Sequence, residues 1–316
     1  HWNKCYFCDL YKKYKFSRRR YEEIEEDLKK AADSEYAQNY TTCFLQDGDA
    51  FVLQTEFLMQ ILEGIHKYLP NIKHVTTYAR ADSIARKSVS ELRELKTAGI
   101  EHLYCGMETG SDLILRKINK GFDAATIIIS GTKAKEAGMV LSEFTLFGIG
   151  GKELAEENAV ETAKVLNVIK PDFVRVHATG IKLSSEMWNY VKNKELTLQS
   201  EEEILSEQKI MLELLADDMD CIYMNEHIVN LLLEVRGNIR TDKQNMLETI
   251  NTYLQLPKQE QELFNLGRRL NIMFFLADLN NRAKRKQTEE GLRKIKTQNP
   301  DLDLAFVCNY VRQTQI

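Results

Sequence analysis

The sequence has no long hydrophobic run, little proline and few cysteines. A membrane-spanning helix needs about 18 consecutive apolar residues, whereas the most apolar stretch here covers only residues 272–276. We therefore expect no membrane span. Four prolines and 15 glycines in 316 residues also leave little material for disordered linkers.

The chain also has no large excess of charge of either sign. The chain has 43 Lys and Arg against 47 Asp and Glu, a net charge of -4, and no long block of either sign. This balance argues against a protein that binds nucleic acid through bulk charge. The short basic clusters at residues 18–20 and 282–286 are predicted to be solvated faces. With 43% hydrophobic residues the chain is globular, and its length predicts about two domains.

Six cysteines are too few for a disulfide scaffold, and we expect reduced thiols in a cytoplasmic protein. Four stand singly in apolar surroundings and are predicted to be small buried hydrophobes: Cys43, Cys105, Cys221 and Cys308. Cys5 and Cys8 differ because a CxxC pair can ligate one metal centre. Zinc would need a further pair of ligands at suitable spacing, and a thioredoxin-like redox pair would follow a strand. Neither context is found.

From residue 20 to 180, helical and strand patterns alternate in units of roughly 30 to 40 residues, which is typical of parallel βα units. Two helices are predicted to end at Gly99 and Gly138, since glycine fits the left-handed position that follows a helix. Further helices are expected at 20–32, 53–69 and 153–169. Strands are expected at 40–46, 72–79, 101–107, 140–148 and 173–178, the last being the final strand of the series.

Beyond residue 184 the pattern becomes helical. We expect helices at 201–215, 226–235, 242–254 and 259–276, and a charged helical tail from residue 281. The chain is therefore predicted to divide into an α/β barrel region, residues 1–217, and a helical region, residues 218–316.

Glycines and carboxylates gather where the predicted strands end, at residues 47–50, 106–111, 148–151 and 177–180. A parallel α/β barrel carries its working residues at these ends. Glycine lets the backbone approach a ligand, and carboxylates bind ammonium or hydroxyl groups. One such loop is ordinary turn chemistry, but four of them behind an N-terminal CxxC favour a ligand site.

Residues 1–216 resemble the radical S-adenosylmethionine (SAM) enzymes. Their motif has three cysteines, the last two spaced CxxC with an aromatic residue before the final one, and Cys5, Phe7 and Cys8 fit it. The stretch from Trp2 to Cys8 is similar to a subgroup whose alignment places the first cysteine immediately ahead of His1. The resemblance implies a partial (β/α)6 TIM-like barrel of the radical SAM type. Its first strand and first cluster cysteine are expected to precede the printed sequence.

In this family, three thiolates hold a 4Fe-4S cluster and leave one iron open to the amino and carboxylate groups of SAM. Cys5 and Cys8 are accordingly expected to be metal ligands. An electron from the cluster cleaves SAM into methionine and a 5′-deoxyadenosyl radical, which abstracts hydrogen from a substrate. The resemblance further implies an external electron donor of the flavodoxin or ferredoxin type. The substrate class stays open between small metabolites, peptides and nucleotides, and we expect one cluster per chain.

The resemblance also implies roles for other residues in binding SAM. Gly48 and Asp49 match the loop that holds the methionine amino group, and Glu108 matches the residue that binds the ribose hydroxyls. Lys120 matches a basic position that pairs with the SAM carboxylate. Phe7, Gly148 and Ile149 are expected near adenine. Ser142, Glu143 and Thr145 are further candidates for the cavity, although alternation leaves open which of them point inward.

His227 and Asn230 are expected to share one face of the helix predicted at 226–235. They could line the substrate cavity or brace the open side of the barrel. Asp242 is expected to cap the next helix. Two alternatives to a radical enzyme stay open: a degenerate barrel that serves as a binding or scaffold protein, and a domain braced by zinc.

Overall fold

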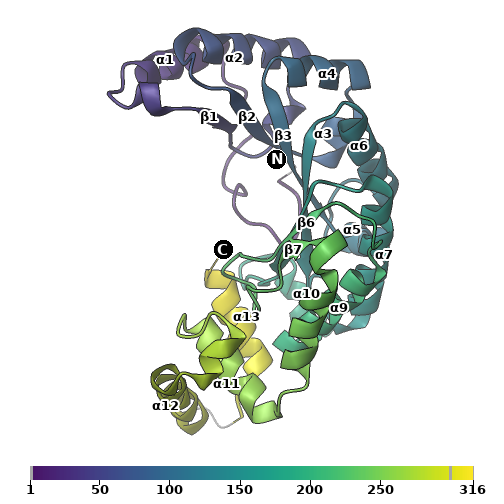
Figure 1. Cartoon of the computed structure of the whole chain (residues 1–316), viewed down its shortest axis with the longest axis vertical. Coiled ribbons are helices and arrows are strands. Elements are labelled where there is room, and N and C mark those ends of the chain that lie inside the picture. Colours follow the sequence, from purple (N-terminus) through teal and green to yellow (C-terminus); the bar gives the residue numbers. More distant parts are fainter. Residues whose placement is uncertain (1–2, 299–300, 316) are drawn as a thin grey trace.

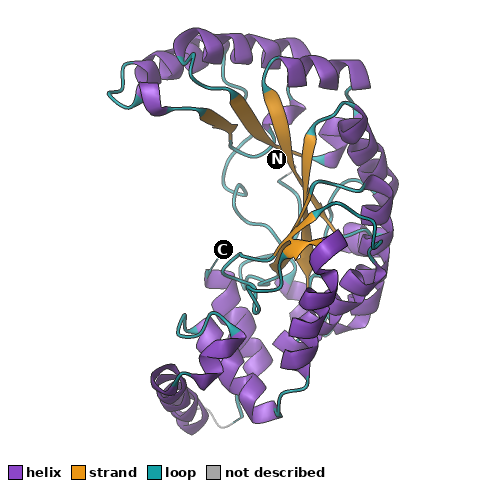
Figure 2. Cartoon of the chain, in the orientation of Figure 1, coloured by secondary structure: helices purple, strands orange, loops and turns teal. Residues whose placement is uncertain are grey.

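The computed structural model describes residues 3–298 and 301–315, which form a curved sheet with helices along its outer side (Figure 1). The strands follow one another across the sheet in chain order, and every neighbouring pair up to β6 is parallel, whereas β7 is antiparallel (Figure 2). The strands are β1 (Thr42–Leu45), β2 (His74–Ala79), β3 (Ile100–Glu108), β4 (Val140–Phe147), β5 (Phe173–Ala178), β6 (Ile222–Met224) and β7 (Gly237–Asn238). This open parallel sheet confirms the predicted α/β partial barrel.

All five predicted strands are confirmed within two residues at each end. The prediction that Phe173–Ala178 is the last of them is wrong, because β6 pairs in parallel with β5. β6 is only three residues long, too short to show a period of two. The sheet therefore extends past residue 217, where the domain boundary was predicted, and that boundary stays a prediction.

Local sequence signals fix the helices that cover the sheet. Ser88 caps α4, and its hydroxyl accepts the backbone N–H of Glu91. Gly99 (φ 117°) and Gly138 (φ 74°) adopt the left-handed conformation after α4 and α6, as predicted. The helices of this region are α1 (Tyr21–Ala32), α2 (Thr55–Tyr68), α3 (Ala81–Ala85), α4 (Val89–Thr97), α5 (Asp112–Lys117), α6 (Ala124–Glu136), α7 (Ala155–Ile169), α8 (Trp188–Lys192) and α9 (Glu201–Leu214).

The main core lies between the sheet and the outer helices. Alternate residues of β3, Leu103, Cys105 and Met107, are fully buried on this side. Among the single cysteines, Cys105, Cys221 and Cys308 are buried as predicted, while Cys43 is half-buried against the same core. The other side of the sheet is left open, and the segment at residues 3–20 runs across it (Figure 1).

The C-terminal region differs from its prediction in three places. Residues 226–235 form a loop, not a helix. The helix predicted at 259–276 ends at Arg269, and α10 begins at Ile239 with Asn238 as its N-cap. Asp242 is therefore not the cap, although its carboxylate accepts the Asn238 N–H. The helices are α10 (Ile239–Leu254), α11 (Lys258–Arg269), α12 (Arg282–Gln298) and α13 (Leu304–Thr314).

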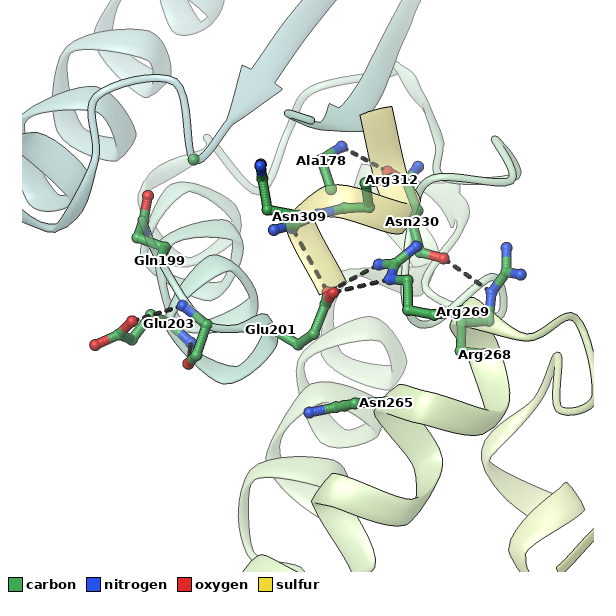
Figure 3. Close-up of polar contacts among 12 residues, drawn as sticks. Ala178, Gln199, Glu201, Glu203, Asn230, Asn265, Arg268, Arg269, Asn309 and Arg312 are labelled. Atoms are coloured by element: carbon green, nitrogen blue, oxygen red, sulfur yellow. Dashed lines mark hydrogen bonds and ion pairs between the residues drawn. The ribbon is translucent and has the colours of Figure 1, made fainter. Parts of the chain in front are cut away.

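A buried ion cluster joins α9, α11 and α13 (Figure 3). Arg269 donates from Nε and Nη2 to the two carboxylate oxygens of Glu201, each at 2.8 Å. Arg312 approaches the same carboxylate at 3.6 Å, and none of the three side chains is more than 2% exposed. Burial alone would raise the pKa of Glu201, but Arg269 and Arg312 hold it at about 2. The cluster fixes the C-terminal helices to one another.

None of the helices in the described part of the chain is long and apolar enough to cross a bilayer.

Candidate functional site

A cavity of about 490 Å³ lies on the inner side of the sheet. It reaches the carboxyl ends of the strands, where the working residues of parallel barrels gather. Six residues predicted from the sequence line it together: Cys5, Phe7, Cys8, Gly48, Glu108 and Lys120. Segments far apart in the sequence therefore meet at one site.

Backbone hydrogen bonds hold the CxxC segment at the cavity. Tyr6 donates its N–H to the carbonyl of Ile118 (2.9 Å) and accepts the N–H of Met187 (3.1 Å). Just beyond the motif, the Asp9 carboxylate pairs with Lys182 at 2.8 Å. These contacts place the two thiols without help from a regular helix or strand.

The two cysteines supply soft sulfur donors to the cavity. Cys5 is 4% exposed, and burial raises the pKa of the Cys8 thiol, with a further contribution from Cys5. Within residues 3–298 and 301–315, no set of three His, Cys, Asp or Glu side chains could hold a metal ion. The first cysteine of the motif, predicted just before His1, lies outside the described residues. Two cysteine sulfurs in one cavity are donors of the kind that an iron-sulfur cluster takes.

Glu108 and Lys120 form an ion pair in the cavity wall. Their Oε1 and Nζ atoms are 2.6 Å apart, and the two side chains are 12% and 7% exposed. Glu108 ends β3 just after a bulge, has φ 65°, and lines the cavity on the same side as Tyr104 and Gly106. Burial alone would lower the pKa of Lys120, but Glu108 and Cys5 raise it overall. Lys120 therefore carries its charge at neutral pH.

Gly106 makes room for this ion pair. A Cβ atom at this position would lie 2.6 Å from Oε1 of Glu108 and 3.3 Å from Nζ of Lys120. Only glycine lets both charged groups approach the strand so closely.

The loop after β1 contributes its backbone to the cavity. Gly48 lines the cavity with φ 90°, whereas Asp49 is not among the lining residues. The Asp49 carboxylate accepts hydrogen bonds from the Ser83 hydroxyl (2.5 Å) and the Arg80 N–H (3.3 Å). Burial raises the pKa of Asp49. In this structure Asp49 ties the loop to α3, and its role toward SAM stays a prediction.

Gly148 and Ile149, predicted near adenine, do not line the cavity either. The Gly148 N–H donates to the buried Glu207 carboxylate at 3.0 Å. Ile149 is fully buried in a small apolar cluster against which Phe7 packs. Ile149 therefore supports the wall behind Phe7, Gly148 is tied to α9, and a contact of either residue with adenine stays a prediction.

The alternation of β4 settles which of its side chains point inward. Phe144 and Leu146 line the cavity, and Ser142 shares their face of the strand. Glu143 and Thr145 point to the opposite, helix-covered side, so the suggestion that they face the cavity is wrong. Glu143 is fully buried and lies opposite Cys105 of β3.

Glu143 makes the stability of the fold depend on pH. Burial raises the pKa of Glu143 from 4.5 to about 8. Between these values the folded chain holds a proton that the unfolded chain has released, so stability falls as the pH rises. Full ionisation costs on the order of 5 kcal/mol. We expect Glu143→Gln to unfold at higher urea concentration than the unchanged protein at pH 8.5, and to match it near pH 5. Equal urea midpoints at pH 8.5 would contradict this assignment.

Of the two roles that the sequence left open, His227 lines the cavity and Asn230 braces the barrel. The His227 ring lies 4.2 Å from the His177 ring, and both line the cavity. Asn230 is buried and braces the end of β5. It accepts the Ala178 N–H at 2.8 Å (Figure 3), and it donates to the Val176 carbonyl at 2.7 Å. The helix on which they were expected to share a face is absent, because these side-chain hydrogen bonds hold the loop.

Several cavity residues were not singled out from the sequence. Tyr78, Tyr104 and Phe144 line the inner side of β2, β3 and β4, and Asp9, Leu10 and Tyr11 follow the CxxC pair. Tyr104 could have been found by counting back in steps of two from Glu108 and Gly106 at the end of β3, and Phe144 by the same count from Gly148 after β4. The segment after Cys8 gives no such signal.

The fold and the site together define a class of protein: a parallel α/β partial barrel with a CxxC pair in its cavity. Residues 2–166 match the model of the radical SAM superfamily. This chain belongs to that superfamily.

Individual relatives are distant. The heme chaperone HemW of Bacillus subtilis (strain 168) is 23% identical over 205 residues, 63% of this chain and 53% of that protein. Among solved structures, the cobalamin-dependent SAM radical enzyme OxsB with aqua-cobalamin and SAM bound gives a TM-score of 0.53 at 12% identity, covering 99% of this chain and 56% of that one. Coproporphyrinogen III oxidase (HemN) from Escherichia coli gives 0.48 at 15% identity, covering 66% and 49%. The chain spans about half the length of each. The similarity to OxsB supports the fold only.

Proposed function

We propose that this chain binds a 4Fe-4S cluster through Cys5, Cys8 and a third thiolate, and that it cleaves SAM reductively in the adjoining cavity. The observation that carries the proposal is that the CxxC pair and the Glu108–Lys120 ion pair line one cavity. When bound, the cluster supplies the electron that splits SAM into methionine and a 5′-deoxyadenosyl radical.

The residues of the cavity would bind and orient SAM. The Lys120 ammonium is suited to the SAM carboxylate, and Glu108 offers acceptor oxygens to the ribose hydroxyls. Because these two side chains face one another, SAM would enter between them. The backbone of Gly48 is open to the methionine amino group, and Phe7 offers a ring to adenine. The buried walls would exclude water from the reacting centre.

An external donor of the flavodoxin or ferredoxin type would supply the electron, as is usual in this family. A second candidate function is a binding protein without SAM cleavage, which the similarity to a heme chaperone favours.

Release of 5′-deoxyadenosine separates the two functions. The full-length protein would be reconstituted with iron and sulfide without oxygen and incubated with SAM and dithionite, and the nucleoside quantified by liquid chromatography with mass spectrometry. The proposal expects 5′-deoxyadenosine only when protein, SAM and reductant are all present. A protein loaded with cluster that releases none would favour the binding protein.

Lys120→Met is expected to weaken SAM binding to the reconstituted protein. The substitution removes the buried cation but keeps most of the side-chain volume, and a hydrogen bond to a charged group corresponds to a loss of about tenfold or more in affinity. Isothermal titration calorimetry measures the change. The matched control is Lys164→Met on the outer surface, where the side chain is 66% exposed and pairs only with Glu161. Equal affinities of the two variants would contradict the role of Lys120.

A further inference from the structure

The inner face of the sheet carries a continuous wall of rings. Starting from β1, Phe44 contacts Tyr78 and Tyr104, with ring centroids 4.7 and 5.4 Å apart. Tyr104 stacks on His102 at 4.3 Å, and Phe144 lies 5.4 Å from His177. Tyr78, Tyr104, Phe144, His177 and His227 line the cavity, so this wall forms one of its sides. Neighbouring rings are tilted by 20° to 70°, so the wall offers both faces and edges to an aromatic ligand.

Arg175 places a cation beside the same wall, next to residues that line the cavity although it is not among them itself. It stands two residues before His177 on β5 and opposite Phe144 of β4, and both of these neighbours line the cavity. Its guanidinium carbon lies 5.0 Å from the centre of the Tyr104 ring and 5.7 Å from that of Phe173. Its Nε donates to the Ser142 hydroxyl at 3.3 Å. Within residues 3–298 and 301–315 no carboxylate forms an ion pair with Arg175, and the side chain is only half-buried.

The histidines of the wall do not add to this charge. Burial and the nearby Arg175 lower the pKa of His102 to about 4. Burial, His227 and Arg175 lower the pKa of His177 to about 3. Both rings are neutral at pH 7, so they can donate or accept one hydrogen bond each while Arg175 alone attracts an anion to this part of the wall.

We propose that this wall is the substrate site, and that the substrate is a flat conjugated molecule that bears a carboxylate, with its plane on Tyr104 and Phe144 and its carboxylate on Arg175. Arginine favours this class because its planar fork binds a carboxylate through two hydrogen bonds while it stacks on aromatic rings. The wall lies in the same cavity as Cys5 and Lys120. The inference rests on the proposed function only in taking that cavity as the place of reaction.

Binding of fluorescent probes tests the inference without the cluster or SAM. The probe is 2-naphthoate, and its binding to the purified chain is followed by fluorescence anisotropy. 2-Naphthamide has the same plane without the charge, and cyclohexanecarboxylate, used as a competitor, has the charge without the plane. We expect 2-naphthoate to bind about tenfold or more tightly than either of the other two.

Substitutions locate the probe. Arg175→Met should weaken 2-naphthoate binding about tenfold or more and leave 2-naphthamide binding unchanged, which also shows that the variant is folded. Tyr104→Leu should weaken both naphthyl probes. The control is Arg93→Met, since Arg93 is 58% exposed and pairs with Glu136 at 3.5 Å. Equal affinity of the unchanged protein and Arg175→Met for 2-naphthoate, or no preference for 2-naphthoate over 2-naphthamide, would overturn the inference. Because no SAM cleavage is measured, these outcomes are independent of the proposed function.

Discussion

Replacing Cys8 by serine is expected to abolish 5′-deoxyadenosine release, with a loss of more than about 100-fold. Of the two thiols that line the cavity in the described structure, only Cys5 would remain, and a hydroxyl is a poor ligand for iron in a cluster. The iron content after anaerobic reconstitution should fall in parallel. Iron and sulfide are measured colorimetrically on the same preparation that is tested for nucleoside release.

The matched control for this substitution is Cys43→Ser. Cys43 lies on β1 and packs half-buried against the main core, and it does not line the cavity. The control should keep its iron and its activity. A Cys8→Ser protein with undiminished iron would contradict the assignment of Cys8 as a ligand, whereas a loss of iron in Cys43→Ser would point to a general loss of folding.

Glu201→Gln is expected to lower the free energy of unfolding by about 3 to 5 kcal/mol, because it leaves buried guanidinium groups without a countercharge. Glu201 and Arg269 are 1% and 0% exposed, so water cannot replace the lost partner. The substitution keeps the shape of the side chain and removes only the charge. Urea unfolding followed by circular dichroism measures the difference.

The pH dependence of that difference is a second test. The pKa of Glu201 is held at about 2, below its value in the unfolded chain, so its contribution is complete above pH 4.5 and is lost only as the pH falls toward 2. The difference between variant and unchanged protein should therefore be constant from pH 5 to 8. Glu161→Gln, which removes an exposed ion pair with Lys164, should cost less than about 1 kcal/mol. A Glu201→Gln protein as stable as this control would contradict the argument.

The parts of the fold that leave a local pattern in the sequence, such as strand periodicity or a glycine after a helix, could be predicted. Strands β1 to β5 could be predicted because each is a short strand pattern next to a helical pattern. Gly99 and Gly138 marked the ends of α4 and α6. The loop at 226–235 could not be predicted. Its apolar residues have helical spacing, but the Asn225 amide donates to the Leu232 carbonyl at 2.5 Å, and such a contact within a loop leaves no periodic pattern.

Site residues could be predicted where they belong to a sequence motif. They could not be predicted where tertiary contacts decide which way the side chain points. Cys5, Cys8 and Glu108 line the cavity as expected. Asp49 carries the expected charge, but Ser83 and the backbone of Arg80 turn its carboxylate toward α3. Arg175 belongs to no sequence motif. Its candidate role follows only from the folded sheet, which places its guanidinium over the Tyr104 ring.

Electron paramagnetic resonance of the reduced, reconstituted full-length protein, recorded with and without SAM, tests the central claim most directly. The account predicts about four irons per chain, a signal from one reduced 4Fe-4S cluster, and a change in that signal when SAM binds the open iron. A protein that holds no cluster under these conditions, or a cluster signal that SAM leaves unchanged, would contradict it.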